Sequence, residues 1–201
     1  MPRPSAHSET PSATERMIEA FWTSLAGRPF EQIAVKNVIS EAQVTRGTFY
    51  YHFDNMLDLA RHALASSVQS GISIFGPVLR GDGGLPSTEE PRRGIGDRWT
   101  SAYFEKVGLF AGPHGSHELT EMAKELVFDA ILEVYDIPAD ELTPEVRTSV
   151  RFIVAGIVDL WGSPDWHGSG KSPTVEELFS FPIVRSNVQL LHAMLDSDEE
   201  P

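Results

Sequence analysis

Apolar residues recur every three or four positions along most of this chain, a spacing that is typical of amphipathic α-helices. The pattern is clearest between residues 119 and 134. There it comprises Leu119, Met122, Ala123, Leu126, Ala130, Ile131 and Val134. No stretch alternates apolar and polar residues convincingly, as a half-buried β-strand would. The sequence therefore predicts an all-α protein.

Capping signals indicate where the N-terminal helices begin and end. Ser12 and Glu15 have the spacing of a capping box, and Gly27 followed by Pro29 ends the first helix. Further helices are predicted at residues 35–41, at 45–52 after a turn around Gln43, and from Asp54, as N-cap, to about Phe75.

The rest of the chain also reads as helices and loops. Residues 80–97 are rich in glycine and proline and are expected to form a loop. Thr143 followed by Pro144 predicts an N-cap with proline in the first helical position. The expected helices are 99–110, 119–134, 144–161 and 182–195, with a short turn of helix near 175–179.

The charge of the chain limits where it can contact nucleic acid. The formal net charge is −13. Residues 1–70 hold six lysines and arginines against seven acidic residues, whereas residues 71–201 hold ten against twenty-two. A strongly acidic body repels polyanions, so any contact with DNA is expected within the first third.

Composition also bears on location. The chain has no cysteine, which excludes disulfides and thiolate metal sites and fits a reducing compartment. No apolar run approaches the roughly 20 residues that span a bilayer, and the N-terminus lacks the apolar core of a signal peptide. The sequence predicts a cytoplasmic protein without a membrane contact.

The segment VTRGTFYYHFDN, residues 44–55, carries the most functional information. Two short helices joined by a tight turn, after a supporting helix, form a helix-turn-helix. On the second helix Phe49 and Phe53 lie on one side, which leaves the others facing outward: Arg46, Gly47, Thr48, Tyr50 and Tyr51. Hydroxyls and a guanidinium suit phosphate, and glycine permits close approach. Such aromatic spacing is also typical of a three-helix unit with a purely structural role. This pattern alone therefore leaves both DNA binding and a structural role open.

The stretch VKNVISEAQVTRGTFYYHFDNMLDL closely resembles the helix-turn-helix of the TetR family of transcriptional regulators. In that family a residue like Thr45 opens the recognition helix and a basic residue like Arg46 follows. A Gly-Thr pair and an aromatic cluster come next, here Gly47, Thr48, Tyr50, Tyr51, His52 and Phe53. The resemblance covers roughly residues 14–64.

This resemblance implies a repressor that binds a palindromic double-stranded DNA operator as a homodimer and is released by a small molecule. It implies a flexible tail at 1–11, a DNA-binding domain at 12–56 and a helical ligand-binding and dimerisation domain at 57–201. By position, Arg46, Gly47 and Thr48 would contact base edges. The implied phosphate contacts are Lys36, Tyr50, Tyr51 and His52. For Tyr51, the alternative to a phosphate contact is packing against the fourth helix. For His52, the alternative is helix capping.

Four residues depart from the family pattern. Ala34 replaces the usual threonine cap of the second helix, and Ile39 replaces a small residue, which could push the two short helices apart. Gln43 replaces the turn glycine and would need a positive φ. Met56 replaces a phosphate-binding lysine. Together they predict modest affinity for DNA or an unusual operator. They also support an alternative, a protein that kept this fold, lost operator binding and acts through a protein partner.

The effector pocket and the dimer surface are harder to locate. Aromatic-lined cavities suit flat or apolar ligands. The best candidates for the pocket are Trp99, Tyr103, Phe128 and Trp161. The last two helical patterns offer an apolar dimer face made of Val154, Ile157, Val158 and Trp161 with Val184, Val188, Leu191 and Leu195.

Three motifs for other functions are weak. GSGKS at residues 168–172 lacks the first glycine of a phosphate-binding loop, because that position is Asp165. HGSHE at residues 114–118 could hold a divalent metal, but a polar loop with Ser116 as N-cap explains it equally. Ser116 and His117 have no third group to orient a base. We therefore expect neither an enzyme nor a bound cofactor or metal.

Overall fold

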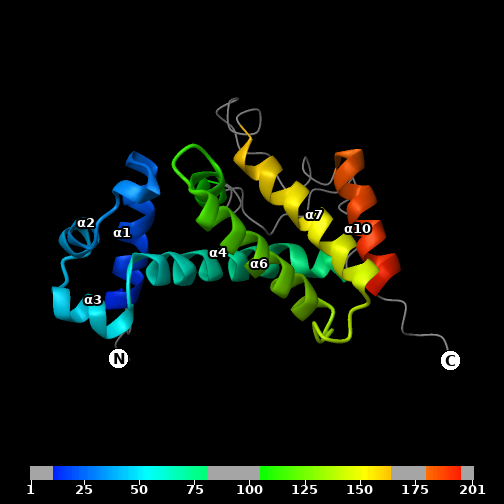
Figure 1. Cartoon of the computed structure of the whole chain (residues 1–201), viewed down its shortest axis with the longest axis horizontal. Helices are drawn as coiled ribbons and strands as arrows, with labels where there is room; N and C mark the ends of the chain where they lie inside the picture. Colours follow the sequence, from blue (N-terminus) through cyan, green and yellow to red (C-terminus); the bar gives the residue numbers. More distant parts are fainter. Residues whose placement is uncertain (1–10, 81–104, 164–179, 196–201) are drawn as a thin grey trace, which may run out of the picture.

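The computed structural model describes residues 11–80, 105–163 and 180–195. This part of the chain consists of helices and connecting segments, with no strand, so the all-α prediction is confirmed (Figure 1). Residues 105–111 are also helical. The named elements are α1 (Ala13–Gly27), the 3-10 helix η1 (Phe30–Gln32), α2 (Val35–Glu41), α3 (Arg46–His52), α4 (Met56–Leu79), α6 (His117–Val134), α7 (Pro144–Gly162) and α10 (Pro182–Leu195).

The capping box that the sequence predicts at the start of α1 is present. The Ser12 hydroxyl accepts a hydrogen bond from the Glu15 N–H at 3.1 Å, and the Ser12 N–H donates to the Glu15 carboxylate at 2.7 Å. This second hydrogen bond lowers the pKa of Glu15. Met17, Phe21 and Leu25 of α1 are fully buried, and they form the centre of the N-terminal helical unit.

The start and end of α4 differ from the prediction. Asn55, not Asp54, is its N-cap, because the Asn55 side chain accepts a hydrogen bond from the Asp58 N–H at 3.0 Å. The Asp54 N–H instead donates to the Asp58 carboxylate at 3.0 Å. The helix also continues beyond Phe75 to Leu79, although it contains Pro77. The continued packing of its apolar face accounts for this length, since Phe75 and Leu79 both lie against the core.

Helix α4 is the axis of the molecule (Figure 1). Its N-terminal part packs against α1, α6 lies across it, and α7 and α10 lie toward its other end. The core is continuous along this axis. Its fully buried residues on α4 are Leu59, Ala60, Ala63 and Leu64.

A second connection joins the segment before α6 to the N-terminal unit. We call it the clamp, and it consists of the contacts that Lys106 and His114 make with that unit. The Nδ1 atom of His114 donates to the Leu25 carbonyl at 2.9 Å. The Phe30 N–H donates to the His114 carbonyl at 2.9 Å. Lys106 forms an ion pair with Glu19 at 3.2 Å. The clamp fixes the segment before α6 to the end of α1 and to η1.

The C-terminal end of α7 rests directly on the backbone of the same segment. A Cβ atom added to Gly162 would lie 2.0 Å from the Ala111 carbonyl oxygen, which is closer than any real Cβ contact. Glycine is therefore required at position 162, because two segments of the backbone approach closely there. Neither segment can move without disturbing α7 or the clamp.

Some predictions lie outside the described residues. These are most of the tail at 1–11, the loop at 80–97 apart from Arg80, the first part of the helix at 99–110 and the turn of helix at 175–179. The remaining helices have the predicted positions, and Thr143 caps α7 with Pro144 in the first turn.

We predict that Gly162→Ala destabilises the protein by roughly 1–3 kcal/mol, the range for overpacked sites. Gly156→Ala, on the same helix, is the matched control, because nothing lies within 4 Å of an added Cβ there. It should stabilise α7 by roughly 0.5–1 kcal/mol. Urea unfolding monitored by circular dichroism measures both. Equal effects of the two substitutions would contradict the close approach at Ala111.

Candidate nucleic-acid interface and ligand pocket

The turn between α2 and α3 is held by α1. The Arg16 Nε–H donates to the Ala42 carbonyl at the end of α2, at 3.1 Å. Gln43 follows with φ of 53°, the left-handed conformation that the sequence required of it. The Val44 N–H then donates to the Ile39 carbonyl at 3.1 Å. The turn therefore keeps its shape without glycine, and Ile39 does not separate α2 from α3, which remain in contact.

Thr45 opens α3 as predicted. Its hydroxyl accepts a hydrogen bond from the Thr48 N–H at 3.0 Å and lies 2.9 Å from the Thr48 hydroxyl. Phe49 and Phe53 point inward and are buried, with ring centroids 5.8 Å apart. The prediction that this aromatic pair orients α3 is confirmed.

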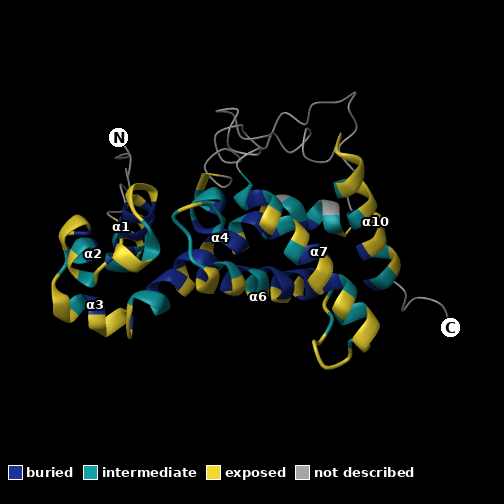
Figure 2. Cartoon of the chain, turned by 45° about the horizontal axis from the view of Figure 1, so that its top comes forward, coloured by how far each residue is buried: buried dark blue, intermediate teal, exposed yellow. Residues whose placement is uncertain are grey.

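The opposite side of α3 is exposed at the end of the molecule, as Figure 2 shows. Tyr50 is 48% exposed and Tyr51 83%, so Tyr51 does not pack against α4. The Arg46 guanidinium carbon lies 5.5 Å from the Tyr50 ring centroid. A Cβ atom on Gly47 would meet only the Thr45 hydroxyl, at 3.7 Å, so the helix surface is open there. Thr48 is half-buried.

His52 and Lys36 lie on either side of this exposed face. The Nδ1 atom of His52 lies 3.3 Å from the Thr14 hydroxyl of α1. His52 therefore ties the end of α3 to α1 and leaves its second ring nitrogen for another contact. Lys36 is exposed in the first turn of α2.

Two of the departures from the family pattern have clear structural consequences. Ala34 begins α2 without a side-chain cap, and the Asn37 side chain accepts a hydrogen bond from the Ala34 N–H at 3.0 Å. Met56 is half-buried and packs against the core, so the first residue of α4 has no cationic group.

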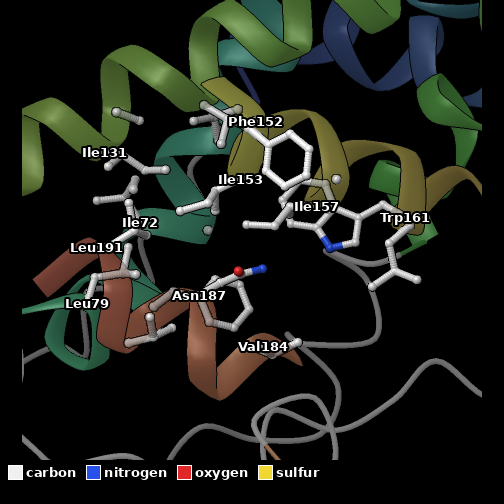
Figure 3. A pocket seen from close by; sticks show the side chains of 18 of the residues that line it. Ile72, Leu79, Ile131, Phe152, Ile153, Ile157, Trp161, Val184, Asn187 and Leu191 are labelled. Atoms are coloured by element: carbon white, nitrogen blue, oxygen red, sulfur yellow. The ribbon is translucent and has the colours of Figure 1, made fainter. Parts of the chain in front are cut away.

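Helices α4, α6, α7 and α10 line a partly open pocket of about 420 Å³ (Figure 3). Trp161 lines it, and its contact with a ligand stays a prediction. Phe128 does not line the pocket, because it is buried elsewhere in the core and the Arg151 guanidinium lies 5.0 Å from its ring. Trp99 and Tyr103 lie outside the described residues. Sequence reasoning missed most of the lining, including Ile72, Leu79, Ile131, Phe152, Ile153, Ile157, Val184, Asn187 and Leu191.

The predicted dimer face is largely wrong. Most of its residues are buried within the subunit, namely Val154, Val158, Trp161, Val188, Leu191 and Leu195. The exposed apolar side chains on these helices are Phe152 at 80%, Ile183 at 64% and Leu190 at 47%. Phe152 lies two residues from Val150 and Val154, and so on the opposite side of α7. A large apolar residue on the side of α7 opposite its buried valines was the sequence signal for this exposed surface.

The motif GSGKS lies outside the described residues, whereas HGSHE has a structural explanation. Ser116 caps α6 by accepting a hydrogen bond from the Leu119 N–H at 3.1 Å, and His114 belongs to the clamp. No group of three metal-ligating side chains occurs within residues 11–80, 105–163 and 180–195. No helix in the same ranges is long and apolar enough to cross a membrane.

Comparison with known proteins identifies the N-terminal unit. The model for bacterial regulatory proteins of the tetR family matches residues 18–63, which run from α1 into α4 and include the whole helix-turn-helix. Residues 18–63 are thus similar to the N-terminal region of tetR family regulatory proteins. The helix-turn-helix therefore resembles a TetR DNA-binding domain, in which α3 corresponds to the recognition helix.

One solved structure matches this chain over nearly its whole length. It is the crystal structure of the TetR family repressor AlkX from Dietzia sp. strain DQ12-45-1b, implicated in biodegradation of n-alkanes. The sequence identity is 16% and the TM-score 0.45, and the match covers 92% of this chain and 97% of that one. No curated protein matches the chain.

We predict that Ala34→Thr stabilises the protein by about 1 kcal/mol, because the new hydroxyl can cap α2. The backbone of Ala34 already has an extended conformation, with φ of −102° and ψ of 153°, as an N-cap requires. Ala34→Val is the control, since it has the same shape without the hydroxyl. Thermal unfolding compares them, and an equal gain from valine would show that capping is not the cause.

Proposed function

We propose that this TetR family regulator binds a palindromic DNA operator as a homodimer, represses transcription there and is released by a small molecule. The observation that carries the proposal is the division of α3 into two sides. Phe49 and Phe53 hold it in the core, while Arg46, Gly47 and Tyr50 are exposed together at the end of the molecule.

The chemistry of this face fits the major groove. The guanidinium of Arg46 can donate two hydrogen bonds to guanine, and the open backbone at Gly47 allows close approach to the bases. Thr48 would add a contact at a base edge. The hydroxyls of Tyr50 and Tyr51, the free ring nitrogen of His52 and the ammonium of Lys36 suit phosphates.

The exposed apolar residues of α7 and α10 support dimerisation. Phe152, Ile183 and Leu190 are largely exposed in the monomer, with Phe152 and Ile183 at the open side of the pocket, and a second copy that covered all three would remove apolar area from water. The dimer would place two copies of α3 about 34 Å apart, the distance between successive major grooves on one side of DNA.

The pocket is positioned to affect the spacing of the two recognition helices. Ile72 and Leu79 of α4 line it, and α4 begins beside α3. Trp161 also lines it, and the adjacent Gly162 rests on Ala111, in the segment that carries the clamp. A ligand that favours a different position of α4 or α7 would select another geometry of the dimer. In that geometry the two recognition helices would no longer fit one operator.

The alternative function is regulation through a protein partner by a member that has lost its operator. The uncapped Ala34 and the packed Met56 favour it, because the first weakens α2 and the second removes a phosphate contact. Selection of bound fragments from the source genome by the purified protein distinguishes the two. A folded dimer that enriches no fragment above a shuffled control would support the partner function.

We predict that Arg46→Ala weakens binding to the selected operator by about 1–3 kcal/mol, or roughly tenfold to a hundredfold. Tyr50→Phe should cost about 0.5–1.5 kcal/mol, since it removes one hydrogen bond. Fluorescence anisotropy at two salt concentrations measures both.

Arg185→Ala is the matched control for these substitutions. It removes the same charge from an exposed position on α10, at the other end of the molecule. If Arg185→Ala and Arg46→Ala weakened binding equally, the recognition surface would not be on α3.

A further inference from the structure

We propose that the effector is an uncharged, mainly apolar molecule with one hydrogen-bonding group, and that Asn187 is the residue that selects this group. The inference rests on the proposed function, because it concerns the effector of the same regulator. It adds the chemical class of the ligand and the side chain that sets it.

The walls of the pocket exclude a charged ligand. They are made of aliphatic and aromatic side chains from four helices, such as Ile72 of α4, Ile131 of α6 and Ile157 of α7 (Figure 3). Among the described residues that line the pocket, none carries a charge. An ionised group buried there without a partner would lose its hydration and gain nothing in return.

Asn187 supplies the amide group of this lining. It lies on α10, and its side-chain amide points into the space between the helices in Figure 3. The residue is half-buried, and no hydrogen bond of its side chain is found among the described residues. It is therefore available to a ligand.

An amide can both donate and accept hydrogen bonds, so it suits a hydroxyl, a carbonyl or an amide. A purely apolar ligand that covered Asn187 would replace the water at its amide without offering a hydrogen bond, which is unfavourable. A ligand with one polar group placed opposite Asn187 avoids this penalty. The volume of about 420 Å³ falls within the range of small-molecule pockets.

The experiment compares probes that share one alkyl chain and differ in the head group. These are 1-decanol, decanoate and decylammonium, used below their aggregation limits at neutral pH with the full-length protein. Binding is followed by thermal shift and by tryptophan fluorescence, since Trp161 lines the pocket. We expect 1-decanol to bind more than about tenfold tighter than either ion, because each ion would be buried unpaired.

Substitution of Asn187 tests its role directly. Asn187→Leu should weaken binding of 1-decanol by about twofold to tenfold, through the loss of one hydrogen bond. Asn187→Asp should reverse the order, so that decylammonium binds tighter than 1-decanol. A residue with a merely structural role would not cause this reversal. Gln189→Leu is the matched control, because Gln189 is an exposed amide two residues along α10.

The results separate this inference from the proposed function. Tight binding of decanoate to the unaltered protein, or an unchanged order of probes in Asn187→Asp, would overturn the inference. So would the absence of binding by all three probes to folded protein. Operator binding measured on the same samples without a probe tests the regulator function independently, since α10, which carries Asn187, and α3 lie at opposite ends of the molecule.

Discussion

The packing of α4 against α1 at one end and against α6 along the rest is the interaction on which this structure depends. Leu59 and Leu64 are fully buried in it, and the same helix reaches the pocket through Ile72 and Leu79. A single helix thus belongs to both the recognition unit and the ligand pocket. This shared helix is the physical connection that the proposed ligand response would use.

Local signals in the sequence predicted much of the fold. The limits of α1 follow from the capping box of Ser12 and Glu15, and the orientation of α3 follows from the spacing of Phe49 and Phe53. These features depend on residues within a few positions of each other. The choice of Asn55 over its neighbour Asp54 as a cap does not, because both residue types cap well and only the position of α4 beside α3 decides between them.

The residues of the pocket and of the proposed dimer surface were less predictable from such local signals. Periodicity shows which side of a helix is apolar, but not whether that side faces its own subunit, a ligand or a second copy. Val154 and Val188 turned out to be core residues, while Phe128 is covered by Arg151 and so excluded from the pocket. Asn187 attracts no attention in the sequence, since a lone amide on a helix is usually solvated.

The clamp and the contact at Gly162 have a consequence for how the protein can evolve. The side chains that these contacts need, those of Lys106 and His114, lie outside the lining of the pocket, and so does Gly162. Random substitution in the lining can therefore alter what the pocket accepts while the contacts to the DNA-binding unit remain. Such an arrangement allows new chemical specificity to be acquired without rebuilding the link to the recognition helix.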